Sequence, residues 1–231
     1  MLEQLKVDVL AANLLLEEYK LITFTWGNVS GIDRESGLMV IKPSGVAYND
    51  LSVDKMVVVD LRGNIVEGSY SPSTDTPTHL YLYNHFPDLG GITHTHSIYA
   101  TTWAQSGLDI PPLGTTHADT FYGPIPCTKP LNVEQITTNY EHETGVKIVE
   151  TFNDHQLTLD MMPAILCNNH GPFTFGASPL AAVKNAKILE IVSQMAFQTY
   201  LLNQDTNKVA QSLLDKHYYR KHGKDAYYGQ K

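Results

Sequence analysis

The segment GITHTH, residues 91–96, carries the strongest structural signal in the chain. An apolar residue and a threonine lead into two histidines at alternate positions, a pattern typical of a short strand. Side chains alternate between the two faces of a strand, so His94 and His96 are predicted to project to the same side. Two imidazoles at this spacing, at a strand end, can hold a metal ion together. We therefore expect a metal site beside the loop that follows.

A third histidine ends another predicted strand. His170 follows the apolar run that predicts a strand over 164–169, and Gly171 permits a tight turn that would expose the imidazole. Three neutral imidazoles suit Zn²⁺, and catalytic zinc sites keep a further position open. The residues alone do not separate His170 clearly from histidines that we expect to be ordinary polar side chains: His79, His85, His142, His155 and His222.

Two short segments are candidates for binding an anion. The segment KPSG, residues 42–45, can turn sharply and expose backbone N–H groups beside the Lys42 charge and the Ser44 hydroxyl. The segment SPSTDTP, residues 71–77, places Ser73 and Thr74 before a predicted helix, whose N-terminus favours negative charge. Taken singly, each segment is a weak signal, because such residues form ordinary turns and helix caps in most proteins. The segment WGNV, residues 26–29, is similarly ambiguous.

Acid and base candidates lie farther along the chain. Asp119 ends the segment GTTHAD, residues 114–119, inside a Pro- and Gly-rich stretch over 107–126 that is long for a loop without function. His217 and Tyr228 belong to the C-terminal tail, where aromatic residues indicate a docked end, on this subunit or on another. A tyrosine hydroxyl near a metal can also transfer a proton.

The remaining pattern predicts helices interspersed with short strands. Helices are expected over 2–16, 77–84, 97–103 and 133–140, and near the end of the chain. A further long helix is expected to begin at Pro179, with Ser178 as its N-cap. Strands are expected over 38–41, 56–59, 64–66, 91–96, 147–150 and 164–169. This alternation indicates a layered α/β domain with a mixed sheet, comprising residues 1–231 without an internal boundary. It does not give the strand order.

Composition narrows the classes of function. The 231 residues are 42% hydrophobic, enough for a substantial core, and carry a net charge of −8. No basic field exists to attract nucleic acid or an anionic membrane. Two cysteines without a CxxC motif favour a reducing compartment, and no signal-peptide or transmembrane pattern occurs. We expect a soluble, cytoplasmic protein.

Seven short motifs occur along the chain in this order: WGN, KPSG, STDTP, THTHS, GTTHAD, NHGP and YYGQ. In this combination of motifs, the chain resembles the class II aldolase and epimerase family, and within it most nearly the pentulose-phosphate 4-epimerases. The resemblance extends over essentially the whole chain. It implies a three-layer α/β/α fold with a mostly antiparallel central sheet. It also implies a homotetramer with active sites at subunit interfaces.

The resemblance also implies roles for individual residues. One Zn²⁺ per subunit would be bound by His94, His96 and His170, with Asp75 as a looser ligand that the residue patterns did not indicate. Asp119 and Tyr228 would be the acid and base, Tyr228 coming from a neighbouring subunit, and His217 would support them. Together with Lys42 from the turn pattern, the residues expected to bind the substrate and its phosphate are Gly27, Asn28, Ser44, Gly45, Ser73 and Thr74.

The implied activity is epimerisation at C4 of L-ribulose 5-phosphate to D-xylulose 5-phosphate, in arabinose or ascorbate catabolism, by cleaving and reforming the C3–C4 bond. The nearest alternative is a related aldolase that releases its fragments, for example from L-fuculose 1-phosphate. Asp75 argues against it, because the family's aldolases tend to carry glutamate there. A metallo-β-lactamase-like hydrolase would need aspartate where Ile98 stands. A non-catalytic domain of the same fold would not need to keep the histidines.

Overall fold

A seven-stranded antiparallel sheet organises the chain in the computed structural model, which describes residues 2–224 and 226–229. Every pairing between neighbouring strands is antiparallel, and an isolated bridge between Cys127 and Leu166 is parallel. The expected α/β fold with a mostly antiparallel sheet is therefore confirmed. In spatial order the strands are β4 (Ile65–Glu67), β3 (Val57–Asp60), β2 (Leu38–Ile41), β1 (Asn28–Asp33), β5 (Gly91–His94), β7 (Pro172–Gly176) and β6 (Ala164–Leu166).

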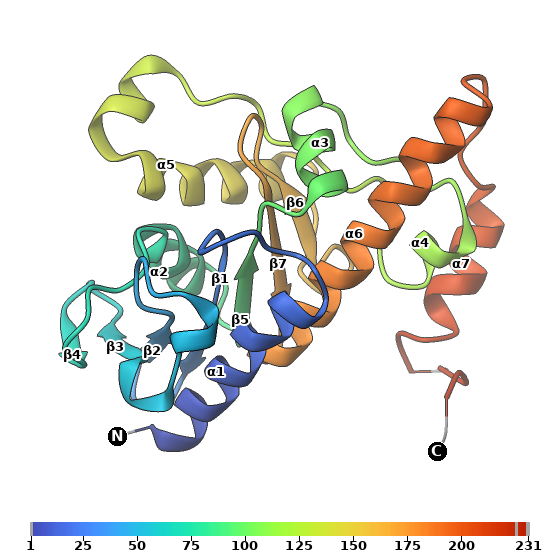
Figure 1. The fold of residues 1–231 in the computed structure, drawn as a ribbon. Coiled ribbons are helices and arrows are strands. Elements are labelled where there is room, and N and C mark those ends of the chain that lie inside the picture. The colour runs from blue at the N-terminus through green and yellow to red at the C-terminus, as the bar shows by residue number, and fades with distance from the viewer. Residues whose placement is uncertain (1, 225, 230–231) are drawn as a thin grey trace.

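Helices cover the sheet and extend beyond it (Figure 1). They are α1 (Glu3–Glu18), α2 (Thr76–His85), α3 (Ile98–Ser106), α4 (Thr115–Ala118), α5 (Val133–Asp154), α6 (Pro179–Leu202) and α7 (Gln211–Tyr219), with short 3₁₀ turns η1 (Tyr48–Asp50) and η2 (Val53–Lys55). Helix α1 packs on β1 and β2, α6 packs on β5 and β7, and α2 packs against α5. No helix among the described residues is both long and apolar enough to span a membrane.

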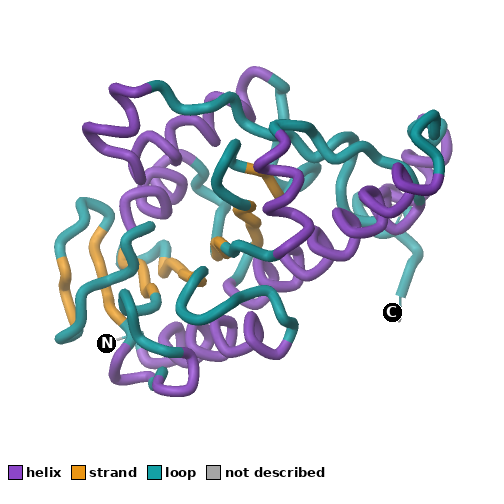
Figure 2. Tube along the Cα trace, turned by 45° about the horizontal axis from the view of Figure 1, so that its top comes forward, coloured by secondary structure: helices purple, strands orange, loops and turns teal. Residues whose placement is uncertain are grey.

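Strand alternation assigns the buried side chains of β2 to two layers. Val40 packs with Val9 of α1, whereas Met39 and Ile41 belong to the larger cluster on the other face of the sheet. Because adjacent residues of a strand point to opposite faces, a continuous apolar run is the expected sequence of a strand covered on both sides. The chain folds back repeatedly across this sheet, as the tube in Figure 2 shows.

Several predicted elements differ from the structure. The strand predicted over 147–150 is wrong: those residues continue α5, in which Ile148, Val149 and Phe152 are buried at helical spacing. The strand predicted over 91–96 ends at His94. Strands β1 and β7 were not predicted. The N-cap at Ser178 is confirmed, since its hydroxyl accepts a hydrogen bond from the Ala181 N–H at 3.2 Å. Of the predicted tail, Asp225, Gln230 and Lys231 lie outside the described residues.

Two glycines let the start of α6 lie directly on the sheet. Gly31 of β1 and Gly91 of β5 are paired in register. A Cβ atom at Gly91 would lie 2.4 Å from the Ser178 carbonyl, and one at Gly31 would lie 2.6 Å from Cγ of Pro179. The bare backbone at this pair therefore sets how closely the longest helix approaches the two central strands.

We expect Gly91→Ala to destabilise the protein by about 1–3 kcal/mol, because the added methyl group meets backbone atoms that cannot rotate away. Gly114→Ala is the matched control, since a Cβ atom at Gly114 would have no heavy atom within 4 Å. Urea unfolding of the two variants measures the difference. Equal midpoints would show that the helix shifts at little cost.

Candidate functional site

Three histidines meet where β5 and β6 end. His94 is the last residue of β5, His96 follows two residues later, and His170 lies on the turn between β6 and β7. The Nε2 atoms of His94 and His96 are 3.1 Å apart, and one ring nitrogen of each residue in the trio lies within 4.8 Å of the others. The structure thus brings together the pair that strand alternation indicated and the third histidine that it could not single out.

Burial keeps these imidazoles neutral. It lowers the pKa of His94 and of His170 to about 3, with the neighbouring imidazoles adding to the effect, and it also lowers the pKa of His96. The Nδ1 atom of His94 lies 3.0 Å from the Pro172 carbonyl oxygen, to which it must donate, so Nε2 carries the free lone pair. Two nitrogens on one tetrahedral Zn²⁺ are separated by about 3.3 Å. The trio fits such an ion in donor type, protonation and spacing.

The turn that carries His170 depends on local backbone features. Asn169 adopts a left-handed conformation with φ of 59°. A Cβ atom at Gly171 would lie 2.7 Å from the Thr95 carbonyl oxygen. Glycine is therefore required at this position by the close approach of the segment between His94 and His96, whereas the left-handed residue of the turn is Asn169.

The two candidate anion segments form one wall. Pro43 and Pro72 pair as an isolated antiparallel bridge, the Ser44 N–H donates to the Ser71 carbonyl at 2.9 Å, and the Ser73 N–H donates to the Lys42 carbonyl at 3.0 Å. Helix α2 begins at Thr76, directly after this wall, and directs its positive dipole end toward it. The two segments, each of which gave only a weak signal of anion binding in the sequence, are thus joined by backbone hydrogen bonds.

Asn28 connects this wall to the histidines. It is paired with His94 in the β1–β5 register, and its side-chain amide donates to Ser73 Oγ at 3.1 Å and to Asp75 Oδ2 at 2.6 Å. Asp75 lies at the N-cap of α2 and outside the compact histidine trio. Its carboxylate faces the same cavity, with one oxygen already engaged by Asn28.

Lys42 is almost completely buried, with 2% of its surface exposed. Its ammonium donates to the carbonyl oxygens of Pro43 and Val46, at 3.2 and 2.9 Å, and lies 4.9 Å from the centre of the Tyr48 ring. Desolvation lowers the pKa of Lys42 to about 8, so the side chain is mainly charged at neutral pH. In this structure the lysine holds the KPSG turn in shape while lining the cavity.

One cavity of about 400 Å³ contains these groups. Its lining includes the histidine trio and every predicted substrate-binding residue, namely Gly27, Asn28, Lys42, Ser44, Gly45, Ser73 and Thr74, together with Asp75. Sequence reasoning missed Tyr140 and Glu141 in this lining, as well as Thr25, which precedes the WGNV segment. The signal that could have found Tyr140 and Glu141 is the predicted end of a helix at Tyr140, which corresponds to a kink in α5 at Asn139.

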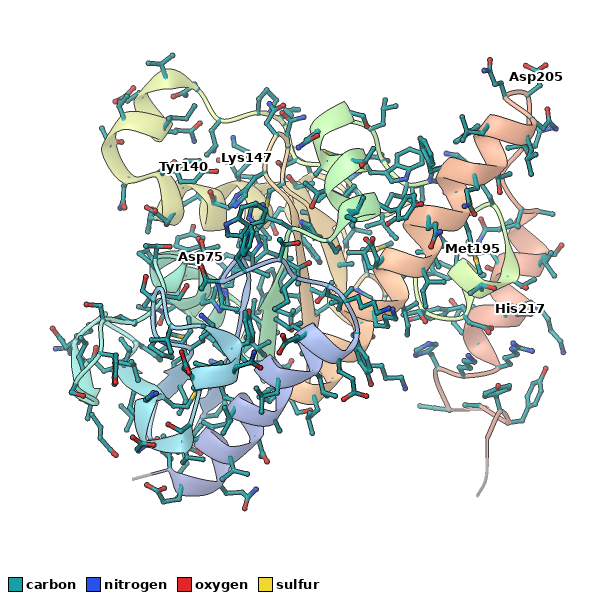
Figure 3. The ribbon with its side chains drawn as sticks, in the orientation of Figure 1. Asp75, Tyr140, Lys147, Met195, Asp205 and His217 are labelled. Atoms are coloured by element: carbon teal, nitrogen blue, oxygen red, sulfur yellow. The ribbon has the colours of Figure 1, made fainter. Side chains whose placement is uncertain are left out.

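The three acid and base candidates are in another place. His217 lies far from Asp75 in Figure 3, and its Nδ1 atom is 2.9 Å from Asp119 Oδ1. Tyr228 is 62% exposed, with its ring over the Arg220 guanidinium at 4.9 Å. None of the three lines the histidine cavity of the same chain. Asp119, His217 and Tyr228 therefore form a second cluster, around α4 and α7.

Cations surround Asp119, whose side chain is only 17% exposed. Arg220 contacts both carboxylate oxygens at 2.8 Å, and Lys221 lies 3.0 Å from Oδ2. Burial alone would raise the pKa of Asp119, but hydrogen bonds from Arg220, His217 and Lys221 outweigh it and lower the pKa to about 2. The carboxylate is thus ionised and joins the C-terminal segment to α4.

The lowered pKa of Asp119 predicts a pH-dependent contribution to stability. Because the folded pKa lies below the ordinary value, the contribution is complete above about pH 4 and is lost as the pH falls toward 2. We expect Asp119→Asn to lower the free energy of unfolding at pH 7 by about 1–3 kcal/mol, since charged hydrogen bonds are lost. The exposed Asp205→Asn is the control. A deficit for Asp119→Asn that stays constant from pH 7 to pH 3 would contradict the assignment.

A family model describes most of this chain. Residues 7–197 match the model of the class II aldolase and adducin N-terminal domain. This span includes both anion segments and the histidine trio, whereas α7 and the tail lie outside it.

Solved structures share the fold. An L-fuculose 1-phosphate aldolase superposes with a TM-score of 0.78 at 23% identity, covering 93% of this chain and 94% of that one. YgbL from Klebsiella pneumoniae, a candidate aldolase/epimerase/decarboxylase, gives 0.73 at 24% identity over 94% and 99% of the two chains. L-fuculose-1-phosphate aldolase from Thermus thermophilus gives 0.69 at 22% identity over 89% and 98%.

Proposed function

Because the chain belongs to the class II aldolase and adducin N-terminal domain family, we propose that it is a zinc-dependent 4-epimerase of L-ribulose 5-phosphate. One observation carries the proposal: a neutral histidine trio and an anion-binding wall at a helix N-terminus line a single cavity. The trio is suited to an ion that contacts the carbonyl end of a sugar. The wall formed by residues 42–45 and 71–75 is suited to the phosphate at its other end.

The chemistry explains why both parts are needed. The C4–H bond of the substrate is not adjacent to the C2 carbonyl, so simple deprotonation at C4 is difficult. Removal of the C4 hydroxyl proton instead breaks the C3–C4 bond and gives the enediolate of dihydroxyacetone and glycolaldehyde phosphate. Rotation of the aldehyde, with its phosphate held by the wall, lets the bond reform on the opposite face, and the proton returns to the C4 oxygen. A bound Zn²⁺ would act as a Lewis acid that stabilises the negative charge developing on the C2 and C3 oxygens.

Two proton-transfer groups would serve the two orientations of the C4 oxygen, and we assign them to Asp119 and Tyr228, with His217 in support. Within one chain these residues form a cluster apart from the histidine cavity. The assignment therefore requires that a second subunit place its cluster at this cavity. We propose a homotetramer with shared sites, in which the exposed Tyr228 reaches a neighbouring subunit.

An aldolase that releases its fragments is the second candidate, favoured by the solved structures named L-fuculose 1-phosphate aldolase. It would use the same cavity. Asp75 supports the epimerase, because its short carboxylate is held by Asn28 at 2.6 Å beside the phosphate wall. A longer glutamate at this position, as the family's aldolases tend to carry, could extend farther toward the reacting carbons.

The deciding experiment supplies L-ribulose 5-phosphate to the zinc-loaded protein and follows D-xylulose 5-phosphate and free glycolaldehyde phosphate. We expect epimer formation without release of fragments, and loss of turnover after chelation. Released fragments would make the protein an aldolase. If the protein retains zinc but does not convert L-ribulose 5-phosphate, the proposed substrate is contradicted.

Shared sites predict complementation between inactive variants. Tyr228→Phe and Asp119→Asn should each lose roughly 10²–10⁴-fold in turnover while retaining zinc. His170→Ala should lose zinc affinity because it removes one ligand. If Tyr228 acts on a neighbouring subunit, co-assembly of Tyr228→Phe with His170→Ala restores about one quarter of the sites. Mixing the separately folded oligomers without exchange is the control, and no recovery after co-expression would contradict a shared site.

A further inference from the structure

Tyr140, which neither the sequence motifs nor the anion wall explains, contacts a member of the histidine trio. Its hydroxyl lies 3.1 Å from Nδ1 of His170, and the two rings are 5.8 Å apart. We propose that Tyr140 is a positioning residue that fixes the orientation and tautomer of His170 for metal binding. This inference rests on the proposed metal-binding function of the trio.

The backbone around this tyrosine is held from two sides. Helix α5 is kinked at Asn139, where φ is −154° and ψ is 62°. Past the kink, the Thr144 hydroxyl donates to the Tyr140 carbonyl at 2.9 Å, and the Thr78 hydroxyl of α2 donates to the Glu141 carbonyl. The first residues after the kink are therefore anchored to both packed helices. Such anchoring holds a long side chain at a defined position.

The histidines differ in how their second ring nitrogen is held. In His94 the Pro172 carbonyl accepts from Nδ1 at 3.0 Å, and the ring stacks on Phe173. His170 lies on a turn, and Tyr140 provides the hydrogen bond to its Nδ1 atom. When the hydroxyl accepts from Nδ1–H, the lone pair on Nε2 is free for the ion. Groups that hold the second nitrogen of a ligand histidine typically change metal affinity 10–100-fold.

The aromatic ring has a separate role from the hydroxyl. Tyr140 and His170 line both the histidine cavity and a neighbouring, mostly apolar cavity of about 230 Å³ that also includes Ile136, Thr144 and Lys147. Figure 3 shows Tyr140 and Lys147 on the same helix, above Asp75. The ring forms part of the wall between the two spaces. Removing only the hydroxyl leaves that wall in place, so Tyr140→Phe isolates the hydrogen bond.

The test measures zinc affinity directly, by competition with a chromogenic chelator after the full-length protein has been stripped of metal. We expect Tyr140→Phe to bind Zn²⁺ about 10–100-fold more weakly than the unmodified protein. We also expect an altered visible absorption spectrum with Co²⁺ and an unchanged melting temperature without metal. Tyr81→Phe is the control, because Tyr81 packs on His142 of the same helix pair and is outside the histidine trio.

Equal zinc affinity of Tyr140→Phe and the unmodified protein would overturn the positioning role alone. Failure of the unmodified protein to bind zinc would overturn the metal centre and this inference with it. A lowered melting temperature without metal, accompanied by an unaltered Co²⁺ spectrum, would show that the hydroxyl supports the fold instead of the ligand.

Discussion

The antiparallel register of β1 and β5 is the constraint on which the candidate site depends. It places Asn28 opposite His94, at the edge where both strands reach the cavity. Asn28 then bonds the start of α2, while His94 bonds the backbone of β7. A shift of one residue in this register would send each side chain to the opposite face of the sheet. The histidine trio and the candidate anion wall are thus coupled by the strand register together with the side-chain hydrogen bonds of Asn28 and His94.

The described residues divide the chemical groups between two locations with different electrostatic character. The histidine cavity combines neutral imidazoles with the buried Lys42 ammonium and the Asp75 carboxylate. Around Asp119, by contrast, Arg220 and Lys221 give an excess of positive charge. In the proposed assembly, a neighbouring subunit would bring this positive charge toward a cavity that receives a phosphorylated sugar. Subunit association would then add both proton-transfer groups and electrostatic attraction for the substrate.

Local sequence signals predicted those parts that depend on local geometry. The cap at Ser178 and the proximity of His94 and His96 are examples, because each involves few neighbouring residues, although β5 itself ends at His94. Strand β1 was not predicted because two of its buried residues, Ser30 and Gly31, are polar or small. The central position of the strand buries these residues, but such residues give no apolar pattern in the sequence. The predicted strand over 147–150 failed because a short apolar run fits a buried helix equally well. Such choices are settled only by packing partners far away in the chain.

The grouping of residues into sites could be predicted from the sequence even less well. The pairing of Pro43 with Pro72 and the contact of Tyr140 with His170 join segments about 30 residues apart, and no local pattern encodes them. The resemblance to a family assigned the residues of the two anion segments and the three histidines to one site, which the residue patterns did not. It carried no information on Tyr140, whose place follows from the kink at Asn139.

The packing of α6 on the paired glycines Gly31 and Gly91 also has a consequence for the synthesis of the chain. Leu16 and Val29 from the first residues share a buried cluster with Val183 and Ala186. During translation, the part of the N-terminal apolar surface that α6 covers therefore stays exposed until about 150 further residues have left the ribosome. Over that interval the nascent chain exposes surface that the finished fold covers. Sequestration by a chaperone at this stage would protect it until the long helix arrives.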